Sequence, residues 1–518
     1  MQNPNGSEKE EKQNNKMAKC PLAATARRVY TLSSVSLTPA RLPPGPRDIP
    51  IIGQAINLNP DKAHLQFTEW RKQYGDLFIF RLLGKNCVVL NHPEIVRNLF
   101  ARQEFLEVTN DRPGGFMAKY VLNDSQDVLF RQYDDRQKCL KESAVNFIEN
   151  HTAKDEKFYE QVSVEIQQFT AGLRSHMHKD IDLMEFIDPS ISKQVALMLC
   201  GKLLSDTDPA MTSFLGFEQA ASELGKVKNQ MALSACPFLR HAPGKLGGTF
   251  RKLAEDREKL LKFFITDTRD RTDKFRCKGL VDALMERALK EKQTSDDWLS
   301  ETFIHGVVMD MTPAAVKPIQ GSLSVLLLLL VNYPHIQQKI RAEVISVVGK
   351  ERQPKLADLP NMPYTHACLQ ELMRYHTPLP LSARHHNRIE IEFDGFIIPK
   401  NTDIYTNLWG IHHDQRFWKD PECFKPERFL SEKGKLLPED HPLRRNYLPY
   451  GVGPRACAGK TFGRNSLFLY LTNIVQNFLL LPSTTEEVPV CDVNYFQPGV
   501  VTRAPSFKVR LTDAARRE

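Results

Sequence analysis

The fold of this chain is decided by the stretch Tyr450-Gly451-Val452-Gly453-Pro454-Arg455-Ala456-Cys457-Ala458-Gly459. Gly451 and Gly453 let the backbone turn back on itself, because glycine reaches conformations that other residues avoid. A loop of this kind can aim the thiolate of Cys457 at a metal while its own N–H groups point toward the sulfur. Taken alone, the stretch fits a buried free cysteine in a turn equally well, since free cysteine usually packs as a small apolar side chain.

The composition of the 518-residue chain is that of a soluble globular protein, with 41% hydrophobic and 25% charged residues. The formal net charge of +8 comes without a basic tract interleaved with aromatic residues. It therefore does not favour nucleic acid as a partner, and it fits an acidic partner protein or peripheral contact with a membrane surface. The ten cysteines are scattered and include no Cys-x-x-Cys pair, which argues against a disulfide scaffold and structural zinc and favours an intracellular, reducing compartment.

The N-terminal part of the chain predicts an extension of residues 1–41 in front of one large domain, residues 42–518. Residues 17–47 contain Arg27, Arg28 and Arg41 and have no acidic residue. This composition fits either a mitochondrial targeting segment or a plain flexible extension. The stiff sequence Leu42-Pro43-Pro44-Gly45-Pro46 then marks the start of the globular body.

A long central helix is predicted between Ser295 and Asn332. Its pattern is apolar nearly all round, so it should cross the core of the domain. The densest apolar run, residues 323–331, is too short to span a membrane, and the chain has no run of about eighteen apolar residues, so we predict no membrane-spanning helix. Pro313 and Pro318 each remove a backbone hydrogen bond, which predicts bends in this helix and a functional reason for them.

The remaining pattern is mainly α-helical with a few short strands. The elements expected are a helix over residues 65–74, a β-hairpin of residues 77–82 and 87–90, a solvated loop over 267–278, a strand pair of 393–399 with 402–405, and a closing hairpin of 500–501 with 507–511.

A possible structural clasp joins two distant parts of the chain. Glu371 and Arg374 are three residues apart on a predicted helix and share a face. Such a pair is most often a surface ion pair. Arg428, in the proline-fixed sequence Pro426-Glu427-Arg428-Phe429, offers a second guanidinium, and a carboxylate held between two guanidiniums would pin this coil against a core helix.

Together these motifs resemble those of the cytochrome P450 haem-thiolate enzymes. The resemblance rests on Glu371-Leu372-Met373-Arg374, on Pro426-Glu427-Arg428-Phe429 and on Tyr450 to Gly459, in the family's order and at its separations, and on the Pro-Pro-Gly-Pro hinge. It covers the chain from Leu42 onward and points to the animal branch with drug-metabolising and steroid 17-hydroxylase members. It implies a mainly α, single-domain P450 fold with small β-sheets and a haem buried between the central helix and the cysteine loop.

The resemblance also implies roles for individual residues. Cys457 is expected to be the axial thiolate ligand of the haem iron, in a cofactor-binding loop that includes Tyr450 and Gly451. Arg455 is expected to pair with a haem propionate, and His385 falls where relatives place a propionate-binding histidine. A plain loop histidine is the alternative for His385. Glu371, Arg374 and Arg428 are expected to form a clasp with no chemical role.

Two departures from the family pattern affect the expected site. At the positions of a haem-contacting Trp and Arg, the chain has Tyr133 and Gln137, with Arg136 or Lys138 as substitutes for the arginine. The central helix lacks the family's acid–threonine motif for proton relay. Aligned from the helix start, Asp310 and Thr312 stand there as a displaced acid and hydroxyl; aligned from the helix end, Pro318 occupies the threonine position and the relay is missing.

The function implied is a haem-dependent monooxygenase that inserts one oxygen atom of O2 into a small lipophilic substrate, such as a sterol, fatty acid or xenobiotic. Electrons would come from NADPH through NADPH–cytochrome P450 reductase, or through a ferredoxin if the protein is mitochondrial. Basic residues near the thiolate would receive this donor. The alternatives are a haem-thiolate isomerase, dehydratase or lyase that needs no oxygen activation, and a non-catalytic haem-binding protein. The expected location is the periphery of the endoplasmic reticulum membrane or the mitochondrion.

Overall fold

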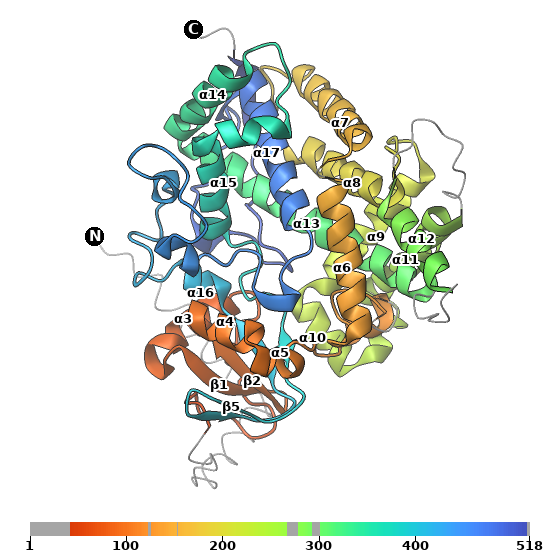
Figure 1. The fold of residues 1–518 in the computed structure, drawn as a ribbon, viewed down its shortest axis with the longest axis vertical. Helices are drawn as coiled ribbons and strands as arrows, with labels where there is room; N and C mark the ends of the chain where they lie inside the picture. The colour runs from red at the N-terminus through yellow and green to blue at the C-terminus, as the bar shows by residue number, and fades with distance from the viewer. Residues whose placement is uncertain (1–41, 123–125, 153, 267–277, 293–300, 515–518) are drawn as a thin grey trace.

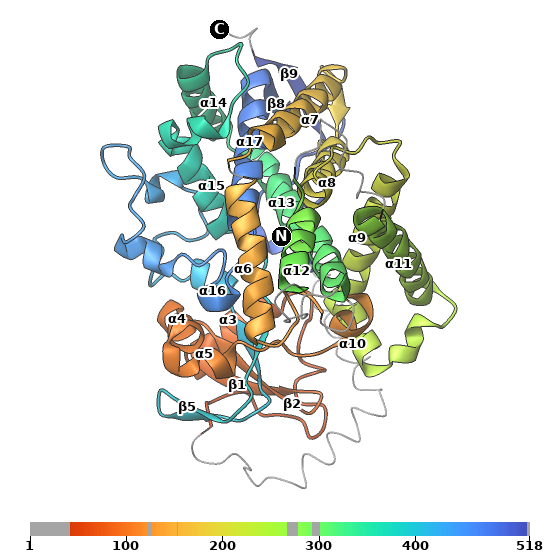
Figure 2. The ribbon, with the colours of Figure 1, turned by 45° about the vertical axis from the view of Figure 1, so that its right-hand side comes forward.

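The longest helix, α13 (Glu301–Asn332), runs through the middle of the molecule, and the other helices pack around it (Figures 1 and 2). The computed structural model describes residues 42–122, 126–152, 154–266, 278–292 and 301–514. The remaining α-helices are α3 (Ala63–Tyr74), α4 (Pro93–Ala101), α5 (Gln103–Thr109), α6 (Asp135–Asn150), α7 (Glu156–Arg174), α8 (Met184–Cys200), α9 (Pro209–Gly225), α10 (Val227–Ala235), α11 (Lys245–Leu261), α12 (Leu280–Lys292), α14 (Pro334–Val348), α15 (Pro363–His376), α16 (Leu408–His412) and α17 (Lys460–Asn477).

Helix α13 is a core helix, as its all-round apolar pattern predicts. It meets the length and composition of a membrane span, but 78% of its most apolar window is buried inside the protein. The helix is continuous through Pro313 and Pro318, so neither proline ends it. The expected helix start at Ser295 and most of the expected loop at 267–278 lie outside the described residues.

Two small sheets and a separate hairpin complete the fold. The first sheet contains β1 (Leu77–Leu82), β2 (Lys85–Leu90), β7 (Asp403–Thr406) and β4 (His385–His386), and the antiparallel β1–β2 pair confirms the predicted hairpin. The second sheet contains β3 (Asp180–Ile181), β9 (Val509–Asp513) and β8 (Phe478–Pro482). The hairpin consists of β5 (Ile391–Phe393) and β6 (Phe396–Ile398). The first sheet packs with α3, α4 and α5 at one end of the molecule (Figure 1).

The predicted pairing of residues 393–399 with 402–405 is wrong. Strand β5 turns back into β6 through Asp394 and Gly395, whose φ angles are 51° and 78°. An Asp-Gly pair with positive φ at both residues is the turn that two-residue hairpins favour. Strand β7 instead lies parallel to β2, and its residues Cys87↔Asp403 to Leu90↔Thr406 are in register.

The predicted closing hairpin is also wrong. Strand β9 pairs antiparallel with β8, which follows α17, and with β3. Val500 and Val501 belong to no strand in the described residues, although Gln497 and Arg503 form an isolated bridge around them. The hydrophobic pattern of a short strand identifies its buried face but not its partner, so the sequence alone did not reveal this long-range pairing.

Candidate functional site

The cysteine loop is a tight turn that leads directly into α17. Gly451 and Gly453 have φ angles of 71° and 69°, in the left-handed region that favours glycine. A Cβ atom on Gly453 would lie 2.3 Å from the carbonyl oxygen of Phe100 at the end of α4. The N–H of Cys457 donates to the carbonyl of Tyr450 at 2.8 Å, which closes the turn. The two glycines therefore serve both the turn and its close packing on α4.

The thiol of Cys457 is enclosed by protein and still presents open surface. Cys457 is exposed at the surface of the loop. The protein around the sulfur still excludes enough water to raise the pKa of the thiol above its ordinary value. The N–H of Gly459, and then the charges of Lys141 and Lys460, oppose that shift and favour the thiolate. Nothing lies within 4 Å of the position that a Cβ of Gly459 would take. A thiol placed in this way can accept a ligand that covers the loop.

The middle of α13 carries its own open surface. Most of the helix is buried, but Ala314 is exposed and Pro313, Ala315, Lys317 and Pro318 are half-buried. Small and apolar side chains at the centre of a core helix leave room for a flat apolar ligand beside them. Helix α17 approaches the same region, because a Cβ on Gly463 would lie 4.0 Å from Ile319. The residues present on α13 and in the cysteine loop therefore fit a buried haem.

Two arginines near the loop, the buried Arg112 and the half-buried Arg455, form no ion pair with an acidic side chain among the described residues. Arg455 donates from Nε to the carbonyl of Asn110 at 2.8 Å, and Arg112 donates from one terminal nitrogen to the carbonyls of Ala383 at 2.7 Å and Arg384 at 2.8 Å. Burial lowers the pKa of Arg112 to about 9 and that of Arg455 to about 10, and the charge of Arg455 contributes to the shift of Arg112. Two such cations suit an anionic ligand, for example the propionates of a haem.

His385 lies beside this pair of cations. Its Nδ1 is 3.1 Å from the carbonyl oxygen of Thr109, and its ring stacks on Phe100 with centroids 3.7 Å apart. Burial, followed by the charge of Arg112, holds the pKa of His385 well below its ordinary value, so the ring is neutral at pH 7. The charges of Arg112 and Arg455 both act on His385, so these three side chains lie in one region, and the role of His385 toward a propionate stays a prediction.

Tyr133 also reaches this place, but Gln137 brings no charge to it. The guanidinium of Arg455 lies 5.7 Å from the centre of the Tyr133 ring. Gln137 is buried, and its amide donates to the carbonyl of Val128 at 3.1 Å. Arg112 supplies the positive charge instead, and sequence reasoning missed it. An arginine in the irregular stretch Asp111-Arg112-Pro113-Gly114-Gly115, between helices, was the available signal.

Asp310 and Thr312 are brought close in the helix but are engaged with the backbone. The carboxylate of Asp310 accepts a hydrogen bond from the N–H of Leu129 at 3.0 Å, which ties α13 to the segment before α6. The hydroxyl of Thr312 donates to the carbonyl of Val308 at 2.8 Å, and the residue is fully buried. Neither side chain belongs to the open part of α13, and their role in proton transfer stays a prediction.

Asp127 and Asp310 form a buried acidic pair that makes stability depend on pH. Burial raises the pKa of Asp127 from 3.8 to about 6, against the opposing N–H of Phe130. Since the folded pKa is the higher one, the bound proton stabilises the native state below about pH 4, and this contribution is lost as the pH rises through about 6. Asp127→Asn keeps the acceptor for Phe130, so we expect the thermal midpoint of the wild type to fall a few degrees more than that of the variant from pH 4 to pH 7. Parallel curves would contradict this assignment.

The clasp residues meet in the core. Arg374 binds Glu371 through two hydrogen bonds of 2.8 Å, and both side chains have 0% exposure. Arg428 adds a third, from Nε to the same carboxylate at 3.0 Å, and the N–H of Lys425 a fourth at 2.9 Å. Arg374 also donates to the carbonyls of His412 and Pro421. The coil over residues 412–428 is thereby fastened to α15.

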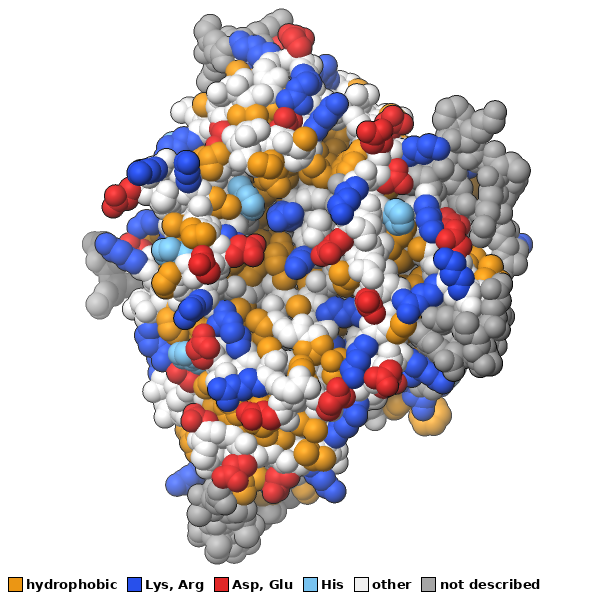
Figure 3. All heavy atoms as spheres, in the orientation of Figure 1, with side chains coloured by type: hydrophobic (Ala, Val, Ile, Leu, Met, Phe, Trp, Pro, Cys, Tyr) orange, Lys and Arg blue, Asp and Glu red, His pale blue; other side chains and the backbone are white. Residues whose placement is uncertain are grey.

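The surface near α6 and α17 is mixed in charge rather than uniformly basic. Lys138 pairs with Glu107 at 2.9 Å and with Asp135 at 3.2 Å. In the orientation of Figure 1, Lys and Arg side chains are scattered among Asp and Glu over the whole face (Figure 3). The basic residues expected beside the thiolate, Arg136, Lys138, Lys141, Lys460 and Arg464, therefore act within a mixed surface.

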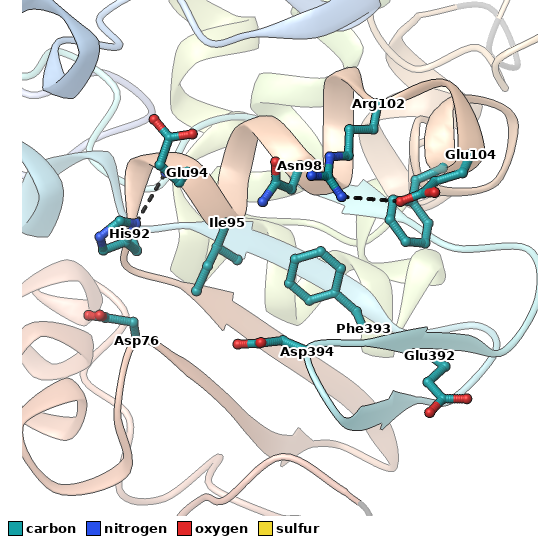
Figure 4. Close-up of a pocket in the computed structure, with 11 residues that line it drawn as sticks. Asp76, His92, Glu94, Ile95, Asn98, Arg102, Glu104, Glu392, Phe393 and Asp394 are labelled. Carbon is teal, nitrogen blue, oxygen red and sulfur yellow. Dashed lines mark hydrogen bonds and ion pairs between the residues drawn. The ribbon is translucent and has the colours of Figure 1, made fainter. Parts of the chain in front are cut away.

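A separate cavity of about 510 Å³ lies between α4, α5 and the β5–β6 hairpin (Figure 4). It carries several acidic side chains and opens to the surface; its lining residues are Asp76, His92, Glu94, Ile95, Asn98, Arg102, Glu104, Phe105, Glu392, Phe393 and Asp394. None of them is a candidate residue of the haem site.

Comparison with known proteins identifies the family. A family model described as Cytochrome P450 matches residues 43–511. Cytochrome P450 1A1 of Cavia porcellus is 28% identical over 454 residues, which cover 84% of this chain and 85% of that protein. Vitamin D(3) 25-hydroxylase of Sus scrofa is 27% identical over 87% of this chain and 89% of that protein. Cytochrome P450 2D19 of Callithrix jacchus is 28% identical over 85% of this chain and 87% of that protein.

The match extends over almost the whole described domain and includes the cysteine loop, the clasp and the central helix. The mainly helical architecture with small sheets agrees with it. The chain therefore belongs to the cytochrome P450 family, oxidoreductases that carry a haem held by a cysteine thiolate and incorporate oxygen from O2 with electrons drawn from NADPH.

Proposed function

We propose that this protein is a monooxygenase of small lipophilic substrates in which Cys457 is the axial ligand of the haem iron. The observation that carries the proposal is the presented thiol of Cys457, in a glycine turn where the N–H of Gly459 hydrogen-bonds the sulfur. Bound haem supplies the chemistry of oxygen transfer. The chain supplies the thiolate, the cations Arg112 and Arg455 with His385 and Tyr133 for the propionate side, and a pocket that excludes water.

The proposed pocket is formed by four segments of the chain. They are residues 106–127, the part of α13 at 303–311, residues 379–383 and the tip at Val500 and Val501. A Cβ on Gly321 would lie 2.9 Å from a methyl group of Val501, so this tip packs on α13. Val500 is 42% exposed. A relative named as a vitamin D(3) 25-hydroxylase makes sterols the first class to test, with fatty acids and xenobiotics next.

For the electron donor, we propose NADPH–cytochrome P450 reductase and a location at the periphery of the endoplasmic reticulum membrane. The relatives reported above give no support to the mitochondrial alternative with a ferredoxin. Docking of an acidic donor would use the basic residues near α6 and α17 and weaken as ionic strength rises. Imaging of the native protein, expressed from its natural start codon, tests whether it lies at the endoplasmic reticulum.

The proton path of this enzyme is proposed not to run through Thr312. Its hydroxyl donates a hydrogen bond to the carbonyl of Val308, and the side chain of Asp310 accepts one from the N–H of Leu129. Thr312→Val keeps the shape of the side chain and removes the hydroxyl. We expect the fraction of electrons that end in product to stay within about twofold of wild type, because a proton donor would contribute about 10²-fold. A tenfold fall in this coupling would restore Thr312 as the proton donor.

The second candidate is a haem-thiolate isomerase, dehydratase or lyase. Alignment of α13 from its C-terminal end favours it, because Pro318 then occupies the position of the threonine that serves oxygen activation. Purified protein with reductase, NADPH and candidate sterols separates the two. Substrate-dependent oxygen uptake, with an atom of labelled O2 in the product, supports the monooxygenase. Turnover of a hydroperoxide without any reductant, and no labelled product, supports the second function.

A further inference from the structure

Lys141 is a basic residue of α6 whose side chain reaches into the cysteine loop. Its Nζ donates hydrogen bonds to the carbonyl oxygens of Pro454 and Ala456. Ala456 directly precedes Cys457, so these bonds fix the backbone immediately before the proposed ligand. The loop itself has two internal backbone bonds in this region, from the N–H of Ala456 to the carbonyl of Gly453 at 3.1 Å and from the N–H of Cys457 to the carbonyl of Tyr450 at 2.8 Å. Lys141 thus joins α6 to the part of the loop that sets the direction of the thiol.

The charge of Lys141 has no carboxylate partner among the described residues. Lys138, one turn earlier on α6, pairs with Glu107 and Asp135. Burial lowers the pKa of Lys141 to about 8, the charge of Cys457 opposes that shift, and the cations Arg455, Arg112 and Lys460 add to it. The hydrogen bond to the carbonyl of Ala456 places the ammonium beside the residue that precedes Cys457.

We propose that Lys141 is a positioning residue that holds the Cys457 loop and tunes the thiolate electrostatically. The proposal rests on the proposed function of Cys457 as the haem ligand. One-electron reduction makes the site more negative, and a fixed cation nearby favours the reduced form. Loss of the cation is therefore expected to lower the midpoint potential. A helix surface lysine whose role is only to receive a donor protein would not change a potential measured without that donor.

The test compares the haem-bound wild type with Lys141→Met, Lys141→Arg and Lys259→Met in redox titrations with small mediators and no partner protein. We expect Lys141→Met to shift the equilibrium toward the oxidised form by on the order of tenfold, or about 59 mV for one electron. Lys141→Arg keeps the charge and is expected to retain most of the wild-type potential. Lys259→Met is the control, because Lys259 is an exposed lysine of α11 that pairs with Glu255, and it is expected to match the wild type.

An unchanged potential in Lys141→Met, or an equal shift in Lys259→Met, overturns the proposal. If Lys141→Met binds no haem, Lys141→Gln replaces it, because an amide can still donate to the two carbonyls without charge. If Lys141→Met and Lys141→Gln bind no haem while Lys141→Arg does, the charge of Lys141 is required and the proposal is supported. If none of the three variants binds haem, the electrostatic role is overturned. The reduced, carbon monoxide-bound wild type is recorded first. If this spectrum lacks the thiolate-type band, the assignment of Cys457 as the haem ligand is wrong. If the band is normal and the potential of Lys141→Met is unchanged, only the proposed role of Lys141 is wrong.

Discussion

Replacement of Cys457 by alanine is expected to remove the thiolate-type absorption band of the reduced, carbon monoxide-bound protein and to lower turnover by at least about 10³-fold, equivalent to about 4 kcal/mol of barrier. The loss is large because the described chain offers no second thiol at this position. The groups that lower the pKa of the Cys457 thiol are the N–H of Gly459, Lys141 and Lys460, and none of them contains sulfur. Without the sulfur, electron density at the metal would come from a different and weaker donor.

The measurement is the difference spectrum of purified protein reconstituted with haem, together with product formation from a sterol substrate. Cys236 is the matched control, because it is also an exposed cysteine and caps the C-terminal end of α10, outside the cysteine loop. Cys236→Ala is expected to keep the wild-type spectrum. A thiolate-type band that survives in Cys457→Ala would show that another cysteine binds the iron.

Disruption of the clasp is expected to cost about 3–5 kcal/mol of folding free energy, which is the range for a buried ion pair that loses one partner. Glu371 and Arg374 both have 0% exposure, so no water can replace a lost bond. Glu371→Gln keeps the size of the side chain but leaves the guanidinium of Arg374 buried without its counter-charge, and Arg428 loses the same partner. We expect little folded, haem-bound protein from this variant.

The exposed pair of Lys339 and Glu427 is the control for the clasp. Its side chains are 54% and 55% exposed and 2.8 Å apart, so Lys339→Ala is expected to cost less than about 1 kcal/mol. Thermal unfolding and the haem content of the purified variants measure both effects. A Glu371→Gln variant as stable as Lys339→Ala would mean that the clasp is replaceable and that packing of Trp418 and Phe429 alone fastens the coil.

Features coded by neighbouring residues were predictable from the sequence. The cysteine turn follows from its glycines, the β1–β2 hairpin from two short apolar runs separated by Gly84-Lys85-Asn86, and the buried helix α13 from its all-round apolar pattern. The clasp was predictable as a pairing because a carboxylate and two guanidiniums at the family's separations have few other uses. Each of these signals lies within a few neighbouring residues or consists of several motifs that match together, so it can be recognised without knowledge of the tertiary structure.

Features that depend on distant segments were not predictable, and the reason is physical. Strand β9 could have paired with any exposed edge; its pairing with β8 and β3 depends on where α17 ends. Arg112 looked like a loop arginine until the tertiary structure buried it beside Arg455 and His385. Asp310 seemed free for chemistry until the N–H of Leu129 occupied its carboxylate.

The sequence by itself thus determined the family, the identity of the thiolate candidate and the course of the helices, because local propensity and spaced motifs are written along the chain. Only the tertiary structure decided which cations gather near Cys457, which strand edges meet and which polar side chains of α13 are already satisfied. Burial and charge at a site are sums over segments far apart in sequence, and folding alone brings those segments together.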